Sequence, residues 1–172
     1  MSKQYGIIKN VFKEEQLDEW CSVFKKLTTT NTSTGDKCYG IDINNLAYKW
    51  FLKKMLPDLQ IHFEEHIKLI FSAFINLETV LPIHDDIKPI PNNAVGKHFV
   101  SILIPFSIDE NKNIDFSKVG TCFYDAEKNL IERVGWDKGC LLWWNSNLLH
   151  SSSDFKKEGV SSKQYWITHT YV

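Results

Sequence analysis

The sequence predicts an α+β protein in which N-terminal helices precede an all-β core of the jelly-roll type. In the first third of the chain, apolar residues recur every three to four positions, as in helices with one buried face. From about residue 68 the period falls to about two, and turn-forming residues separate short segments, as in antiparallel sheets. Aromatic residues make up 13% of the 172 residues, which favours a core built on sheets.

We expect one domain over residues 1–172, with 1–67 as mainly helical support and 68–172 as the β core. The length is that of one ordinary domain, and 43% apolar with 24% charged residues is typical of a globular protein. No internal repeat and no linker-like stretch divides the chain.

The support is predicted to contain three helices. Asn10 can cap the first, a polar loop at Thr28–Lys37 follows it, and Pro57 ends the second because proline pushes the preceding residue out of helical geometry. The predicted helices are Val11–Leu27, Asn45–Leu56 and Asp58–His66.

Seven strands are predicted after the helices, each bounded by turn residues such as those in Asp137–Gly139 and Asn145–Asn147. The predicted strands are Leu69–Leu77, His98–Pro105, Gly120–Tyr124, Asn129–Val134, Gly139–Trp144, Leu148–Ser152 and Lys163–Tyr171. Helices followed by many short strands indicate a sandwich or barrel.

The most informative segment is Leu81–Asp86, which contains a His-x-Asp pair. In an extended chain, residues i and i+2 point to the same side, so His84 and Asp86 aim together while Asp85 aims away. His150, 64 residues downstream of Asp86, is the third candidate ligand. Two histidines and one carboxylate form a facial triad that suits non-haem Fe(II) and leaves coordination positions open.

A lysine begins the last apolar strand, where a core would not normally hold a charge. Lys163 makes sense there if it meets a carboxylate inside the barrel. The alternative is a solvated lysine at the edge of the sheet. If the register of this strand were shifted by one residue, Gln164 would point inward instead of Lys163, and the barrel interior would lose the positive charge.

This order of motifs resembles the 2-oxoglutarate/Fe(II)-dependent oxygenase family, in its prolyl-hydroxylase-like and aspartyl-hydroxylase-like branches. The resemblance covers roughly residues 69–172. Gly139–Trp144 with the turn before His150 is similar to the family's "G-x-apolar … H" passage, and Gln164–Thr168 resembles its "R/K-x-x-apolar-T" final strand. The resemblance implies a double-stranded β-helix core with N-terminal support helices.

The resemblance also implies roles for single residues. His84, Asp86 and His150 would hold Fe(II), and Lys163 would bind the distal carboxylate of 2-oxoglutarate, although most family members use arginine there. From their strand positions, Asn76, Ser101 and Tyr165 are candidates to hydrogen-bond this co-substrate. The implied reaction is hydroxylation by O2 of a peptidyl residue or a small molecule, with decarboxylation of 2-oxoglutarate to succinate.

Two other functions stay open. His62, Glu65 and His66 match the H-x-x-E-H pattern of a zinc hydrolase, because histidines at i and i+4 share one face of a helix. A solvated helix face is the simpler reading of that pattern. A cupin-like binding module without catalysis would keep the jelly roll and lose the metal.

Charge and cysteine content restrict the partners and the compartment. A net charge of −1 argues against general nucleic-acid binding. Cys21, Cys38, Cys122 and Cys140 form no CxxC pair, which is typical of a reducing compartment. No apolar segment resembles a signal peptide or spans a membrane, so we expect a cytoplasmic protein. The oligomeric state is not predicted.

Overall fold

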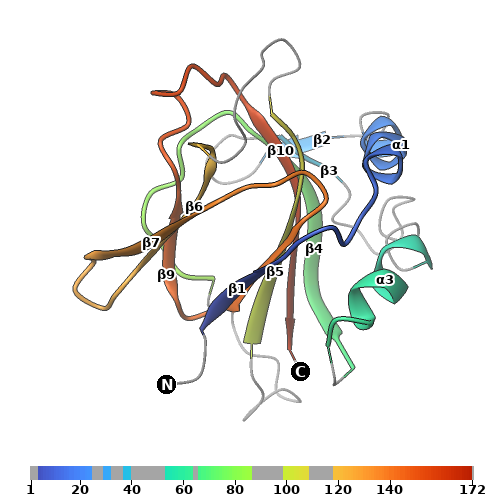
Figure 1. Ribbon diagram of the computed structural model, residues 1–172, viewed down its shortest axis with the longest axis horizontal. Helices are drawn as coiled ribbons and strands as arrows, with labels where there is room; N and C mark the ends of the chain where they lie inside the picture. The colour runs from blue at the N-terminus through green and yellow to red at the C-terminus, as the bar shows by residue number, and fades with distance from the viewer. Residues whose placement is uncertain are drawn as a thin grey trace.

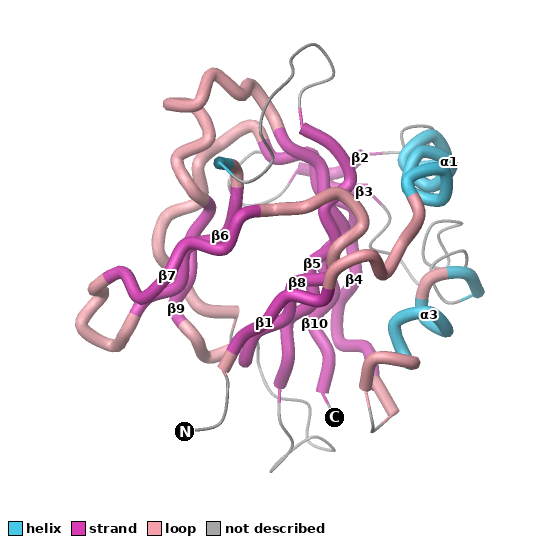
Figure 2. The backbone as a smooth tube through the Cα atoms, in the orientation of Figure 1, coloured by secondary structure: helices cyan, strands magenta, loops and turns pink. Residues whose placement is uncertain are grey.

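The computed structural model describes residues 4–24, 29–31, 37–39, 53–63, 66–86, 99–108 and 118–171. Within these residues, two antiparallel sheets lie opposite each other, and two helices lie beside the larger sheet on its other side (Figure 1). Strand is the main regular structure of the described backbone, and the two helices lie together on one side of the molecule (Figure 2). The predicted α+β class with N-terminal helices is confirmed at this level.

The larger sheet has seven strands in the order β1-β8-β5-β10-β4-β3-β2. The last strand in the chain, β10, therefore lies at its centre between β4 and β5. The strands are β1 (Tyr5–Ile8), β2 (Thr29–Asn31), β3 (Lys37–Tyr39), β4 (Lys68–Leu77), β5 (Phe99–Ile108), β8 (Leu141–Asn145) and β10 (Lys163–Tyr171).

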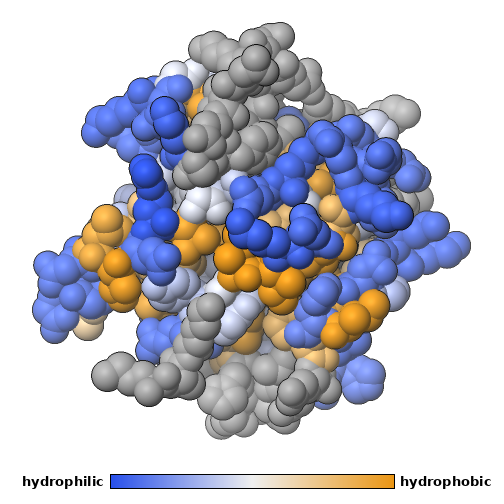
Figure 3. All heavy atoms as spheres, viewed as in Figure 1, coloured by the Kyte–Doolittle hydropathy of each residue, from blue (hydrophilic) through white to orange (hydrophobic). Residues whose placement is uncertain are grey.

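The smaller sheet has the order β7-β6-β9 and consists of β6 (Gly120–Tyr124), β7 (Leu130–Gly135) and β9 (Leu149–Ser152). The β6–β7 hairpin extends away from the larger sheet (Figure 1). On β7, Leu130 and Ile131 are 59% and 50% exposed, and Figure 3 shows apolar residues beside hydrophilic ones on this hairpin.

The first helix, α1 (Glu14–Phe24), is shorter than the predicted Val11–Leu27. The backbone N–H groups of Val11 and Phe12 both donate to the carbonyl of Gly139, so these residues are held by a loop instead of a helix. Asn10, the predicted cap, lies outside the helix with a φ of 56°. The predicted N-cap is therefore wrong, and the helix begins with Glu14 and Glu15, which suit its positive end.

The helix predicted over Asn45–Leu56 falls mostly outside the described residues. The next helix, α3 (Leu56–Gln60), has Pro57 in its first turn, where the missing N–H removes no helical hydrogen bond. It ends at Gln60 and not at His66, and the Gln60 side chain accepts a hydrogen bond from the N–H of Ile67 beyond the helix. The predicted helix Asp58–His66 is thus about half as long as expected.

All seven predicted strands are present, with ends shifted by up to three residues. Gly139 was predicted to open a strand, but it forms a turn with a φ of 79°, and β8 starts at Leu141. Strands β1, β2 and β3 were not predicted. Because all three lie before residue 67, that part of the chain contributes to the larger sheet as well as supporting it.

Both faces of the larger sheet are buried. The inner face, toward the smaller sheet, carries Tyr165 and Ile167 of β10, and the outer face, toward α1 and α3, carries Trp166 between them. The inner core joins the two sheets and includes Ala73, Ile75, Leu103, Phe123, Trp136, Leu142, Trp144 and Phe155. The outer core includes Leu17, Trp20, Met55, Leu59, Phe74, Ile102, Ile104 and Phe106.

Candidate metal centre

A single antiparallel bridge places His84 opposite His150. The N–H of each residue donates to the carbonyl of the other, at 2.9 and 2.8 Å. Directly opposite residues of an antiparallel pair project to the same side. The two imidazole rings accordingly lie together, with centroids 4.3 Å apart. Since His150 belongs to β9, the bridge adds His84 to the edge of the smaller sheet.

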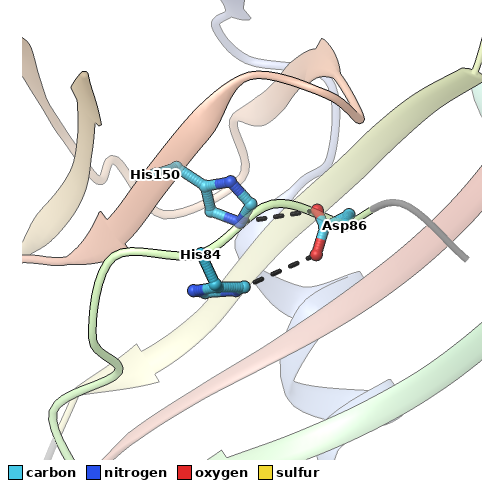
Figure 4. Close-up of side chains that lie close together, drawn as sticks. All are labelled: His84, Asp86 and His150. Atoms are coloured by element: carbon cyan, nitrogen blue, oxygen red, sulfur yellow. Dashed lines mark ion pairs between the residues drawn. The ribbon is translucent and has the colours of Figure 1, made fainter. Parts of the chain in front are cut away.

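Asp86 completes a cluster with the two histidines (Figure 4). Its N–H donates to the carbonyl of Ser146 at 2.8 Å. A backbone hydrogen bond therefore fixes the position of Asp86, as the bridge to His150 fixes that of His84. His150 Nε2 lies 3.4 Å from Asp86 Oδ2, and His84 Nε2 lies 3.9 Å from Oδ1. One donor atom from each residue falls within 4.8 Å of the others, as the His-x-Asp spacing predicts for an extended chain.

Both histidines are held in the tautomer that a metal needs. His84 Nδ1 lies 2.8 Å from the carbonyl of Pro82, and His150 Nδ1 lies 2.9 Å from the carbonyl of Leu148. A carbonyl only accepts hydrogen bonds, so each Nδ1 carries a proton and donates. The Nε2 atoms, which face Asp86, then present lone pairs, as in metal-binding histidines oriented by a backbone carbonyl.

Burial and charge also favour the metal-binding protonation states. Burial raises the pKa of Asp86, but His150, His169 and a hydrogen bond from Ser101 outweigh it and hold the pKa below its usual value. Burial lowers the pKa of His150, and the attraction of Asp86 offsets this only in part. At neutral pH the cluster thus holds an ionised carboxylate beside a neutral His150, the forms that bind divalent metals.

Lys163 is buried on the inner face, which is the orientation that the sequence left open. Its Nζ donates to the carbonyl of Gly120 at 3.3 Å and lies 4.1 Å from the ring centroid of Trp136 and 5.1 Å from that of Phe155. No carboxylate of the described residues forms an ion pair with it. Burial lowers its pKa to about 7.

Gln164 points to the outer face, where its side chain contacts Asn76 and Cys21. Asn76 pairs with Gln164 across β4 and β10, so it also lies on the outer face. Asn76 therefore does not share a face with Lys163, which argues against the prediction that both residues contact the same co-substrate. The large sheet separates its amide from Lys163.

The other two predicted co-substrate residues lie on the inner face. Tyr165 is buried, and its ring packs edge-on against Trp136 at 5.5 Å. Ser101 is fully buried, and its hydroxyl donates to Asp86 Oδ2 at 2.7 Å. Ser101 therefore contacts the carboxylate of the cluster.

Sequence reasoning missed His169, which is buried on β10. Its Nδ1 lies 3.0 Å from Ser101 Oγ and 3.8 Å from Asp86 Oδ2. His169 follows Lys163 by six residues, an even number that places both on one face of a strand. That parity is the only signal in the sequence that could have identified it.

The pattern for a zinc hydrolase is not supported by local structure. His62 and His66 are both exposed and lie after the end of α3 at Gln60, so they do not share a helical face. Glu65 lies outside the described residues. Within the part of the chain that the structure describes, the one cluster of three metal-binding side chains is His84, Asp86 and His150.

The cysteines do not contribute to this cluster. Cys122 and Cys140 are free thiols, the Cys21 thiol contacts Gln164 on the outer face, and Cys38 has no described side chain. Burial raises the pKa of Cys140 to about 12, so it behaves as an apolar core residue.

Among the described residues, no helix is long and apolar enough to cross a bilayer.

No protein-family model and no curated protein matches the sequence. Solved structures do match in three dimensions. HygX from Streptomyces hygroscopicus, with nickel, 2-oxoglutarate and hygromycin B bound, is 11% identical, with 99% of this chain and 83% of that chain covered and a TM-score of 0.68. A Pseudomonas putida prolyl-4-hydroxylase is 11% identical, with 99% and 92% covered and a TM-score of 0.68.

A third similar structure is the Trichoplax adhaerens prolyl hydroxylase in complex with a peptide fragment of the oxygen degradation domain of hypoxia inducible factor. It is 14% identical, with 99% of this chain and 84% of that chain covered and a TM-score of 0.63. At these identities the likeness is one of fold. The chain has the same fold as these hydroxylases and HygX.

Proposed function

We propose that this protein is a non-haem Fe(II)- and 2-oxoglutarate-dependent dioxygenase with a double-stranded β-helix core. It would hydroxylate a peptidyl residue or a small molecule with O2 while 2-oxoglutarate is decarboxylated to succinate. The observation that carries this proposal is the preorganised His84, Asp86 and His150 cluster, located in a fold shared with 2-oxoglutarate-binding HygX and with prolyl hydroxylases.

The donor set fits Fe(II). Two imidazole Nε2 atoms and one ionised carboxylate would hold the metal on one side, as in the facial triad of non-haem iron oxygenases. When bound, the iron supplies the coordination and activation of O2 that side chains cannot provide. The part of the protein is to present the ligands without rearrangement, which the two Nδ1–carbonyl hydrogen bonds achieve.

Lys163 is the proposed partner of the distal carboxylate of 2-oxoglutarate. A buried cation with no carboxylate partner is costly, so an anionic ligand in its place would be strongly favoured. Trp136 and Phe155 surround the ammonium group and keep water away from it. Tyr165, two residues further along the same face of β10, is a second candidate contact.

The surroundings of the cluster differ on its two sides. Trp144 packs against the His150 ring at 4.9 Å, and Phe123 packs against Trp144, so this side is dry. The His84 side chain is 36% exposed. A substrate would therefore approach from the side of His84. Peptidyl and small-molecule substrates are both supported by the compounds bound to similar structures, a peptide fragment and hygromycin B.

Succinate formation tests the proposal. Purified protein with Fe(II), 2-oxoglutarate and O2 should release succinate, at a low rate even without the hydroxylated substrate. Asp86→Ala should abolish both Fe(II) binding and succinate release, whereas His62→Ala removes an exposed histidine outside the cluster and should change neither. Fe(II) binding that survives Asp86→Ala would refute the site. A wild-type protein that neither binds Fe(II) nor turns over 2-oxoglutarate would favour the cupin-like binding module, which has lost its metal.

A further inference from the structure

One row of side chains on the inner face contacts the carboxylate of Asp86. Trp144 of β8, Ser101 of β5 and His169 of β10 lie directly opposite one another across these three neighbouring strands. We refer to these three residues as the brace. All three are buried, with exposed fractions of 1%, 0% and 6%.

The brace contacts one oxygen of Asp86. Ser101 Oγ donates to Oδ2 at 2.7 Å, and Trp144 Nε1 donates to the same atom at 3.0 Å. A carboxylate oxygen has two lone pairs, so these two donors occupy the hydrogen-bonding capacity of Oδ2. The lone pairs of Oδ1, which faces His84, are left for a metal.

The neighbours of Ser101 determine which group donates and which accepts in the series of hydrogen bonds that ends at Asp86. The single hydroxyl hydrogen of Ser101 goes to the carboxylate, which only accepts. The two other neighbours of Ser101 Oγ, Ser146 Oγ and His169 Nδ1, both at 3.0 Å, must then be donors. The hydroxyl is saturated with one donated and two accepted hydrogen bonds, and His169 holds it in this orientation.

We propose that Ser101, Trp144 and His169 are positioning residues that make Asp86 a ligand through Oδ1 alone. A metal that took both oxygens would have to displace Ser101 or Trp144 from Oδ2. By preventing this, the brace preserves a coordination position that a chelating co-substrate and O2 require together. This inference rests on the proposed function, because it presupposes a metal at the His84, Asp86 and His150 cluster.

The outer face of the same sheet offers matched controls. Ser72 is buried, its hydroxyl lies 2.6 Å from that of Thr168, and it accepts a hydrogen bond from the indole of the buried Trp166 at 2.8 Å. Ser72→Ala and Trp166→Phe therefore remove the same atoms from equally buried strands as Ser101→Ala and Trp144→Phe, without touching Asp86. A general loss of stability should affect both pairs alike.

Binding of Co(II) alone to the full chain, followed by calorimetry and visible absorption, tests the proposal. Ser101→Ala and Trp144→Phe should each weaken Co(II) binding about tenfold or more and alter the Co(II) ligand-field bands, which report coordination number. Ser72→Ala and Trp166→Phe should leave affinity and spectrum unchanged. Ser101→Thr, which retains the hydroxyl, should restore the spectrum.

His169 acts through Ser101 in this scheme. His169→Phe should weaken Co(II) binding in the wild-type background and have no further effect beside Ser101→Ala. Wild-type affinity and spectrum in both Ser101→Ala and Trp144→Phe would overturn the brace while leaving the metal site intact. Equal losses in the control variants would overturn it too. A wild-type protein whose Co(II) binding is unaffected by Asp86→Ala would instead refute the proposed function and the brace with it.

Discussion

His84 and His150 face each other across one antiparallel bridge, but only His150 is enclosed. The His84 side chain is 36% exposed, whereas that of His150 is 7% exposed and packs against Trp144. The two residues are therefore equivalent as candidate ligands and unequal as parts of the core. Substitution can separate these contributions.

We expect His84→Ala and His150→Ala to lose metal binding alike, by more than about 100-fold, because each removes one of the three proposed ligands. Only His150→Ala should lower the free energy of unfolding substantially, by about 1–3 kcal/mol, since it opens a buried space beside Trp144. Metal titration and thermal unfolding in the presence of a chelator measure the two effects. Equal destabilisation by both variants would contradict this assignment of burial.

The lowered pKa of Lys163 predicts that co-substrate binding depends on pH. Its pKa of about 7 in the ligand-free protein lies below the ordinary value, so its protonated fraction falls as the pH rises through 7. A dicarboxylate would bind the protonated form, and binding above that pH must take up one proton. The affinity for 2-oxoglutarate should thus fall about tenfold per pH unit above pH 8.

Calorimetry at pH 8 in buffers of different ionisation enthalpy measures this proton uptake. The pKa values of Asp86 and His150 lie below their ordinary values, so neither group titrates in this range. Burial raises the pKa of Cys122, which remains a thiol. A 2-oxoglutarate affinity that is constant from pH 7 to 9 would show that Lys163 is already charged before binding.

Replacing Lys163 should affect stability and binding in opposite directions. Lys163→Met keeps most of the volume and removes a buried charge without a carboxylate partner, so below pH 7 the free energy of unfolding should rise by roughly 1 kcal/mol or more. Binding of 2-oxoglutarate should fall more than about 100-fold. Lys157→Met, at a side chain 81% exposed, is the control and should change neither quantity.

The β6–β7 turn contains a backbone conformation that favours glycine. Lys128 has a φ of 64°, and the turn is closed by hydrogen bonds from Asn129 to Asp125. Lys128→Gly should raise the free energy of unfolding by about 0.5–1 kcal/mol, because glycine adopts positive φ without strain. The neighbouring Glu127→Gly should lower it. Chemical denaturation of both variants compares them, and destabilisation by Lys128→Gly would show that the turn is not strained.

The positions of seven strands along the chain, and two of the three residues of the cluster, could be predicted because they follow from local rules. Alternation and turn residues located the seven strands, and the i, i+2 rule placed His84 with Asp86. His150 could be predicted only from the order of the motifs along the chain, since its bridge to His84 joins segments that are distant in the sequence.

The face of each residue in the larger sheet could not be predicted in the same way. Both faces of that sheet are buried, so β4 reads as a nearly continuous apolar run without polar alternation. This is why strand position alone could not show that Asn76 lies on the outer face, and why the orientation of Lys163 against Gln164 stayed open. His169 was missed for a related reason, because its contact with the surroundings of Asp86 is made through Ser101 in a neighbouring strand.

The most direct test of the metal centre is anomalous scattering from crystals grown with Fe(II) under anaerobic conditions. The proposal predicts one strong iron peak within bonding distance of His84 Nε2, His150 Nε2 and Asp86 Oδ1, with Asp86 Oδ2 still hydrogen-bonded to Ser101 and Trp144. A peak elsewhere, for example at His62 and His66, or no peak at the cluster, would contradict it.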